Sequence, residues 1–251
     1  MSRTDRVVDS ITQMILDGKL APGDRLPIER DLAVDLAVSR GSLREGVRAL
    51  TLLGVLHTRQ GDGTYVTSLD ASVLLGPMGL LVELQGAGNA LHIHTVRRLM
   101  ETEAASLAAI NAGTRAGFDS TKAALAKARD ALDGSAHILS LPHVDHERLL
   151  EADVAFHSSI AELAGNPVLA ALIAAFATRT ARARLWRAIA QDGALQRTQQ
   201  EHELILHAIV DRDSERARIR MASHLLEVED FIDSERAEAS SVGGPEVRAL
   251  Q

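Results

Sequence analysis

Apolar residues in the first 53 positions recur every three to four residues, which predicts three helices. Gly18 ends the first helix, and a second begins after Pro27. Ser39 is a good N-cap for a third helix that runs to about Leu53. The apolar faces of the three helices are Val7, Val8, Ile11, Met14 and Ile15, then Leu32, Ala33 and Leu36, then Leu43, Val47 and Leu50.

Two short strands follow, at 55–59 and 64–67, and the glycine-rich segment Gln60-Gly-Asp-Gly63 forms the tip of the hairpin between them. Three helices and a two-stranded ribbon within about 70 residues are typical of a winged helix-turn-helix, which places its third helix in the major groove of DNA. We therefore expect a DNA-binding domain over residues 1–67.

The predicted third helix carries arginines at i, i+4 and i+8, namely Arg40, Arg44 and Arg48, on the face opposite its apolar side. Its first turn holds small residues that let backbone N–H groups approach a phosphate. These small residues are Ser39, Gly41 and Ser42. The alternative is that the arginines form a solvated face of a small helical domain.

From about Asn89 the apolar pattern predicts only helices. The expected fold class is therefore mainly α, with an N-terminal winged helix-turn-helix and a C-terminal all-α antiparallel helix bundle. Residues 68–88 form a connector with several glycines, 89–238 the bundle, and 239–251 a disordered tail with Gly243-Gly244-Pro245. The expected helices of the bundle span 91–112, 115–133, 146–164, 167–190, 194–211 and 213–237.

Composition supports the helical class and excludes several functions. The chain has 251 residues, of which 46% are hydrophobic but only 2% aromatic, so its core must consist of Ala, Leu, Val and Ile. The absence of cysteine excludes disulfides, thiolate zinc sites and a thiol nucleophile. Charges in the first 20 residues argue against a signal peptide, and the longest apolar run is interrupted by Gly76 and Pro77. We expect a cytoplasmic protein without membrane contact.

The net charge of −7 does not argue against DNA binding once it is divided between the two parts of the chain. Residues 1–67 contain nine Lys and Arg against nine Asp and Glu, whereas 68–251 contain 18 against 25. The acidity therefore belongs to the C-terminal part, and a small basic patch lies in the N-terminal part.

Four polar residues occupy positions where the helical pattern of the C-terminal part expects apolar ones. Asp153 and His157 lie at i and i+4 on one stripe, and His202 and His224 lie on the stripes of two further helices. A buried carboxylate and three buried imidazoles suit a divalent metal, with zinc as first choice and nickel or iron as alternatives. The simpler explanation is a hydrogen-bonded Asp–His pair beside two satisfied core histidines.

The order of several motifs resembles that of the GntR family of bacterial transcription regulators, in the FadR branch whose effector domain is of the FCD type. The DNA-binding motifs are Leu26-Pro-Ile-Glu-Arg-Asp-Leu-Ala33, Val38-Ser-Arg-Gly-Ser-Leu-Arg-Glu45, Leu53-Gly-Val-Leu56 and Gln60-Gly-Asp-Gly-Thr-Tyr-Val66. The effector-domain motifs are Val96-Arg-Arg-Leu-Met-Glu-Thr-Glu-Ala-Ala105, Asp153-Val-Ala-Phe-His157, Ala164-Gly-Asn-Pro167, Glu201-His202 and His224-Leu225. The resemblance covers about residues 1–237.

For DNA recognition, the resemblance implies a homodimer that binds a pseudo-palindromic operator in double-stranded DNA. Arg30, Arg40 and Arg44 match family positions that contact DNA, and Gly61 matches the glycine of the wing tip that approaches the minor groove. The neighbouring backbone contacts match Ser39, Gly41 and Ser42.

For the effector domain, the resemblance implies that Asp153, His157, His202 and His224 are metal ligands and that the effector is a small carboxylic or sugar acid. Arg97 matches an arginine of the effector pocket, although Thr95 stands where the family often has an acid. We therefore predict a metal-containing, ligand-responsive regulator, a repressor rather than an enzyme. The alternatives are a metal-dependent hydrolase-like enzyme and a DNA-binding regulator whose metal is purely structural.

Overall fold

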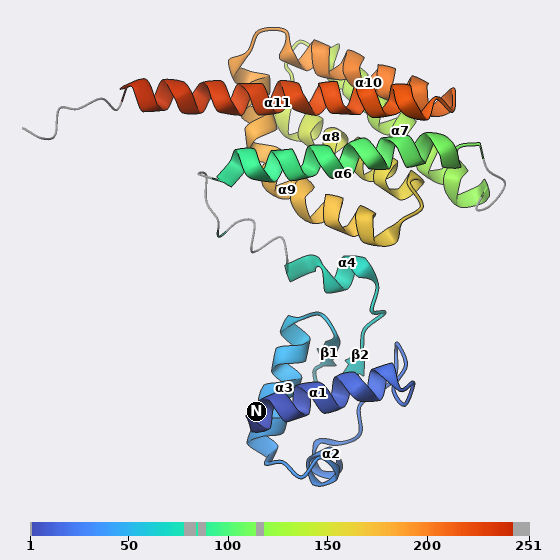
Figure 1. Ribbon diagram of the computed structural model, residues 1–251, viewed down its shortest axis with the longest axis vertical. Coiled ribbons are helices and arrows are strands. Elements are labelled where there is room, and N and C mark those ends of the chain that lie inside the picture. The colour runs from blue at the N-terminus through green and yellow to red at the C-terminus, as the bar shows by residue number, and fades with distance from the viewer. Residues whose placement is uncertain (1, 78–83, 85–88, 114–117, 243–251) are drawn as a thin grey trace, which may run out of the picture. The chain divides into compact units, whose positions relative to one another are not determined.

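The computed structural model describes residues 2–77, 84, 89–113 and 118–242, and the chain divides into two compact units, 1–80 and 81–251. The first unit is a winged helix-turn-helix and the second is helical throughout its described residues (Figure 1). The predicted fold class is therefore confirmed. The domain limits at 67 and 88 stay predictions, because residues 78–83 and 85–88 of the expected connector lie outside the described residues.

The first unit is built on helices α1 (Arg3–Leu16), α2 (Glu29–Asp35) and α3 (Arg40–Leu52), with the short α4 (Ala71–Leu74) after the ribbon. A capping box between Ser2 and Asp5 begins α1, and Ser39 caps α3 as predicted. Their apolar faces form one core, which contains Val7, Ile11, Leu20, Leu26, Leu32, Ala33, Leu43, Leu50, Leu56 and Val66.

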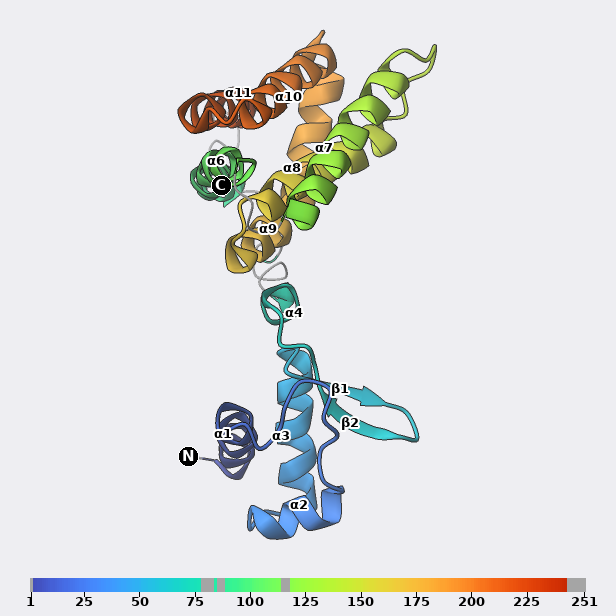
Figure 2. The ribbon, with the colours of Figure 1, turned by 90° about the vertical axis from the view of Figure 1, so that its right-hand side faces the viewer.

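The wing is an antiparallel ribbon of β1 (Leu56–Arg59) and β2 (Gly63–Val66), seen beside α3 in Figure 2. Its register pairs Leu56 with Val66, so the two inward residues of the ribbon both join the core of the unit. Helices α1 and α3 approach closely at Gly46, where a Cβ atom would lie 2.5 Å from Cγ1 of Val7. A glycine at this position therefore allows α1 to pack closely against α3.

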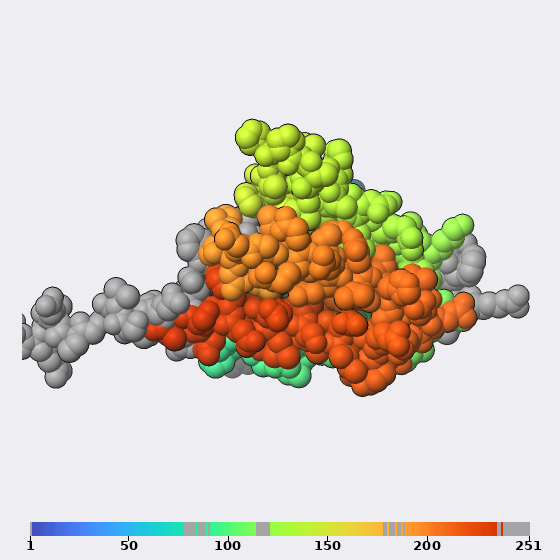
Figure 3. All heavy atoms as spheres, turned by 90° about the horizontal axis from the view of Figure 1, so that it is seen from above, coloured from blue at the N-terminus to red at the C-terminus, as the bar shows by residue number. Residues whose placement is uncertain are grey.

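The second unit packs its helices around alanine-rich faces, as the composition predicts. Ala104, Ala105, Ala108 and Ala109 of α6 are buried, and such small side chains let helix axes approach closely. Helix α6 packs most extensively against α11, and α7 against α8. Figure 3 shows α10 and α11 side by side on one face of the unit. The helices are α6 (Ala90–Asn111), α7 (Phe118–Leu139), α8 (His146–Leu163), α9 (Pro167–Ala190), α10 (Ala194–Val210) and α11 (Ser214–Val242).

Two predicted boundaries in this unit are wrong. The helix expected to end at residue 133 continues through Gly134 to Leu139, because one glycine costs a helix only about 1 kcal/mol and Ser135 is buried with its hydroxyl on the Ala131 carbonyl. The tail expected from 239 begins as the last turn of α11, which ends just before Gly243. Residues 243–251 lie outside the described part of the chain, as do 115–117 at the start of the predicted second helix of the bundle.

None of the described helices has the length and apolar character needed to cross a membrane.

Candidate metal centre and DNA-binding surface

The structure brings together the four predicted ligand residues of the second unit. Asp153 and His157 come from α8, His202 from α10 and His224 from α11, and one ligand atom of each lies within 4.8 Å of the others. The three imidazoles are buried and the Asp153 side chain is 13% exposed. The i, i+4 spacing on α8 and the apolar stripes of α10 and α11 account for this convergence.

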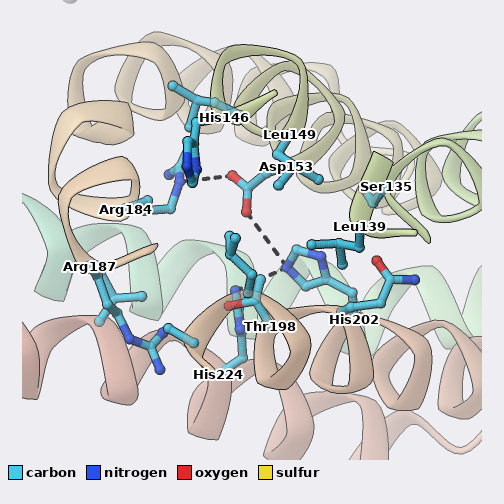
Figure 4. Close-up of a pocket in the computed structure, with 15 residues that line it drawn as sticks. Ser135, Leu139, His146, Leu149, Asp153, Arg184, Arg187, Thr198, His202 and His224 are labelled. Atoms are coloured by element: carbon cyan, nitrogen blue, oxygen red, sulfur yellow. Dashed lines mark hydrogen bonds and ion pairs between the residues drawn. The ribbon is translucent and has the colours of Figure 1, made fainter. Parts of the chain in front are cut away.

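The spacing within this cluster fits a small metal ion. Oδ1 of Asp153 lies 3.8 Å from Nε2 of His157 and 3.8 Å from Nε2 of His202, and the Nε2 atoms of His202 and His224 are 3.2 Å apart. Bonds of about 2.0–2.1 Å to one zinc ion place neighbouring ligand atoms roughly 3 Å apart. Figure 4 shows Asp153, His202 and His224 pointing toward one another.

Two carboxylates hold the far sides of two of these imidazoles. Nδ1 of His157 faces Oε2 of Glu101 in a short contact, and Nδ1 of His224 lies 2.8 Å from Oε2 of Glu201. A carboxylate at Nδ1 keeps the proton there and leaves the Nε2 lone pair free. Nε2 of His157 is indeed buried without a hydrogen-bond partner, so a cation is the group that would satisfy it.

Arg184 of α9 orients the fourth residue. Its Nε lies 2.8 Å from Oδ2 of Asp153, which leaves Oδ1 for the cluster (Figure 4). Burial, the largest influence, raises the pKa of Asp153, but Arg184 and the three imidazoles together hold that pKa below its ordinary value. Asp153 is therefore ionised, as a metal ligand must be.

The imidazoles of His202 and His224 are held in their neutral form by their surroundings. Burial and the neighbouring imidazole of His157 lower the pKa of His224 from 6.5 to about 3, and burial and His224 lower that of His202 well below 6.5. Neutral imidazole is the form that binds a metal. Burial raises the pKa of Glu201, although Arg187 and Arg197 oppose this.

Arg97 faces inward, but it meets other protein groups first. It is fully buried, its Nη2 lies 2.6 Å from Oε1 of Glu101, and its Nη1 donates to Oγ1 of Thr180 at 2.7 Å. Arg184 donates to the same Thr180 hydroxyl at 3.2 Å. Arg97 therefore reaches the cluster through Glu101 and Thr180, and its predicted contact with an effector stays a prediction.

A small pocket of about 60 Å³, open to solvent, lies beside the cluster. Three cluster residues line it together with Arg184 and Arg187, while Arg97 is not among its lining residues. Apolar side chains from α7, α8 and α10 cover most of the remaining wall (Figure 4). A space of this size can take the carboxylate end of a small acid, with the guanidinium groups of Arg184 and Arg187 beside it.

In the first unit, the predicted DNA-contacting residues lie on the exposed side of α2, α3 and the wing. Ser39 Oγ accepts from the backbone N–H of Ser42 at 3.1 Å, and Arg40 and Gly41 are exposed in the first turn of α3. Arg44 pairs with Glu29 at 2.8 Å, but both side chains are more than half exposed, so the pair is weak. Arg30 pairs with Asp31 at 3.0 Å and is equally exposed.

The wing tip is held in a defined shape. Gly61 has a φ of +77°, a conformation that favours glycine, and it is exposed at the tip. Arg25 donates to the Asp62 carbonyl in a short contact, and the Tyr65 hydroxyl donates to Oδ2 of Asp62 at 2.7 Å. The tip is therefore braced from both sides.

The sequence pattern missed three residues that surround the cluster of Asp153 and the three histidines: Glu101, Glu201 and Arg184. Glu101 lies four residues after Arg97 within a family motif, and that helical spacing was the available signal. Glu201 precedes His202 in a family motif, and that proximity was the available signal. Arg184 had no such signal, because only the packing of α9 against α8 brings it to Asp153.

Comparison with known proteins gives a family match for each of the two units of the chain. Residues 3–66 match the family described as bacterial regulatory proteins, gntR family, and residues 92–227 match the FCD domain. The chain is 31% identical to the HTH-type transcriptional regulator LutR of Bacillus subtilis, across 87% of this chain and 96% of that protein. It is 28% identical to the galactonate operon transcriptional repressor of Escherichia coli, across 86% and 91%.

Among solved structures, a Streptococcus agalactiae GntR protein has the same fold with a TM-score of 0.63 and 24% identity, covering 90% of this chain and 99% of that one. The winged helix-turn-helix, the helical second unit and these matches define a DNA-binding transcription regulator and not an enzyme. The chain belongs to the GntR family, in the FadR branch that carries an FCD effector domain.

The buried pair of Arg97 and Glu101 yields a stability prediction. Arg97→Met should lower the free energy of unfolding of the bundle by about 3–5 kcal/mol, because the buried Glu101 carboxylate would lose its arginine and keep only the contact with His157. The neighbouring variant Arg98→Met should cost less, since the pair of Arg98 with Glu229 is partly exposed. Denaturant unfolding followed by circular dichroism measures both. Equal decreases in the free energy of unfolding for the two variants would show that the buried pair stabilises the bundle no more than the partly exposed pair does.

Proposed function

We propose that this chain is a metal-containing repressor that binds operator DNA as a homodimer in the cytoplasm and releases it when a small organic acid enters the pocket of the FCD domain. The observation that carries the proposal is the pocket lined both by Asp153, His202 and His224 and by two arginines. A metal ion and two guanidinium groups at one pocket favour an anionic ligand. The two relatives are named as regulators of transcription, and one of them as a repressor of a galactonate operon.

The donor set supports a divalent metal, zinc first and nickel or iron next. Asp153 Oδ1 and the Nε2 atoms of His157, His202 and His224 would hold it, and the ion would supply Lewis acidity toward a ligand oxygen. Glu101, Glu201 and Arg184 would keep the ligand atoms aimed inward. Without a cation, the Nε2 atom of His157 is buried with no hydrogen-bond partner, which is an unfavourable arrangement.

Metal analysis tests this directly. The purified full chain should contain about one divalent metal ion per chain, and His202→Ala should lose it, whereas His207→Ala should keep it because His207 is exposed and pairs with Asp211. Glu201→Gln should weaken metal affinity by about 10- to 100-fold, because it no longer holds the proton on Nδ1 of His224.

The matched control for Glu201→Gln is Glu203→Gln, an exposed residue on the same helix that contacts only Gln199 among the described residues. Mass spectrometry of the bound metal and competition with a chelating dye give stoichiometry and affinity. Metal binding that is unchanged in both His202→Ala and Glu201→Gln would place the ion elsewhere.

The pocket also favours an effector site over a purely structural metal. Structural zinc sites are closed around four protein ligands, whereas three of the four cluster residues here line a pocket that reaches solvent. The carboxylate of an acid, or the two oxygens of a hydroxy acid, would reach the metal, and Arg184 and Arg187 would balance its charge. Arg97 would act on the same site through Glu101 and Thr180.

Acid titration in the presence of DNA tests the effector. Galactonate and acetate serve as probes, and the duplex is the one that the wild-type chain selects from a random library. At least one acid should change DNA affinity by about 5- to 150-fold, the range of typical allosteric coupling. The change should vanish after chelation of the metal and in Arg184→Gln. An equal effect of the acid on the chelated protein would contradict the proposed site.

A second copy of the chain has a suitable surface to bind. The adjacent helices α6 and α11 expose large apolar side chains at helical spacing, which single folded domains seldom leave in water. Two copies joined there would present two recognition helices to two half-sites. The apolar residues concerned are Val96, Leu99 and Ile110 of α6 and Ile219 and Leu226 of α11.

We propose that Arg30, Ser39, Arg40, Gly41, Ser42, Arg44 and Gly61 contact the operator, since all except the partly buried Ser42 are exposed on α2, α3 and the wing. Arg44→Ala should reduce affinity for the selected duplex by about tenfold or more, because a base-contacting arginine contributes about 1–3 kcal/mol. The matched control is Lys19→Ala, which removes an exposed positive charge from the turn after α1.

Sedimentation of the protein with labelled duplex gives affinity and stoichiometry together, and two chains per duplex are expected. An Arg44→Ala protein that binds the selected duplex as tightly as Lys19→Ala would remove Arg44 from the contact set.

A further inference from the structure

A second positively charged feature of the first unit extends beyond the predicted recognition helix. An open concave surface of about 590 Å³ lies between the starts of α1 and α3 and the helix α2. Its lining contains four arginines and no acidic residue. The arginines are Arg3 and Arg6 of α1, Arg30 of α2 and Arg40 of α3, and the remaining lining residues are Ala33, Val34, Ala37, Val38 and Ser39.

The protein itself leaves most of this positive charge unbalanced. Among the described residues, Arg3, Arg6 and Arg40 have no acidic partner, and only Arg30 has one, in the exposed pair with Asp31. The nearby acids are used elsewhere: the Asp5 carboxylate accepts from the backbone N–H of Ser2, and that of Glu45 accepts from the Thr4 hydroxyl. Four like charges that converge with only one exposed counter-charge cost free energy unless an anion joins them.

Arg3 and Arg6 also contribute little to the stability of the helix that carries them. They occupy the first turns of α1, where the helix dipole favours negative groups. Both side chains are exposed, so they do not take part in the core. Their position is therefore better explained by a ligand than by folding.

We propose that Arg3 and Arg6 bind the phosphate backbone of the operator next to the groove that α3 enters. The concave surface is continuous with Ser39 and Arg40, so the inference rests on the proposed placement of α3 on DNA. A duplex backbone is the anion that fits, because its successive phosphates can meet several arginines on different helices at once. Contacts of this type add affinity to any sequence and carry no base information.

The experiment measures salt-dependent binding of Arg3→Ala/Arg6→Ala in the full chain to two probes, the duplex selected by the wild-type chain and a scrambled duplex of equal length. Loss of two phosphate contacts should reduce the slope of log affinity against log salt by about 2 and lower affinity by roughly 10- to 30-fold on both probes. Arg3→Lys/Arg6→Lys should keep the slope, because lysine retains the charge.

Controls separate this inference from a general charge effect and from the proposed contact set. Lys19→Ala in the same unit and Arg220→Ala, an exposed arginine of α11, remove a positive charge away from the concave surface and should leave the slope unchanged. Thermal unfolding of Arg3→Ala/Arg6→Ala should match that of the wild type.

Each outcome is decisive. If Arg3→Ala/Arg6→Ala keeps the wild-type salt slope while Arg44→Ala loses affinity as expected, only the proposed role of Arg3 and Arg6 is overturned. If both Arg3→Ala/Arg6→Ala and Arg44→Ala bind DNA with the wild-type affinity and salt slope, the proposed placement of α3 on DNA is overturned as well. A loss confined to the selected duplex would show base reading and would contradict a backbone contact.

Discussion

The effector domain depends on one buried arrangement of charge, in which three of the four cluster residues are each held by a charged group behind them. Glu101 and Glu201 hold two imidazoles, Arg184 holds Asp153, and Arg97 holds Glu101. Because these groups come from different helices, the packing of the bundle and the geometry of the cluster depend on each other. Whatever binds at the inner faces of the ligands would thus favour one arrangement of α8, α9, α10 and α11.

This dependence is the physical basis on which a small acid could influence a DNA-binding protein. A ligand shifts a conformational equilibrium only by its difference in affinity for the two states. The pocket is formed by several helices of one unit, so an anion that touches Arg184 of α9 and His224 of α11 contacts two helices at once. In the first unit, the residues proposed to contact DNA are mostly exposed, and the ion pairs of Arg30 and Arg44 are weak enough for DNA to replace at low cost.

Much of the fold followed from the sequence, because apolar spacing and caps are local signals. Ser39 begins α3, Pro167 begins α9, and His157, His202 and His224 are buried as their stripes predict. The ends of helices were less predictable: Gly134 does not stop α7, because a glycine only weakens a helix that the bundle supports.

The four predicted ligand residues could be found because each is a polar residue in an apolar stripe. The groups behind them could not, since Arg184 meets Asp153 only through the packing of α9 on α8. Likewise, Arg3 and Arg6 are ordinary surface residues in the sequence, and only the folded unit shows them beside Arg40.

The central claim is that three imidazoles and one carboxylate surround a single metal ion in the FCD domain. X-ray absorption at the zinc edge, measured on the full chain loaded with one equivalent of zinc, tests it most directly. The account predicts a nitrogen and oxygen shell at about 2.0–2.1 Å with the scattering pattern of three imidazoles, reduced to two in His224→Ala. A shell without imidazole, or a spectrum that His224→Ala leaves unchanged, would contradict it.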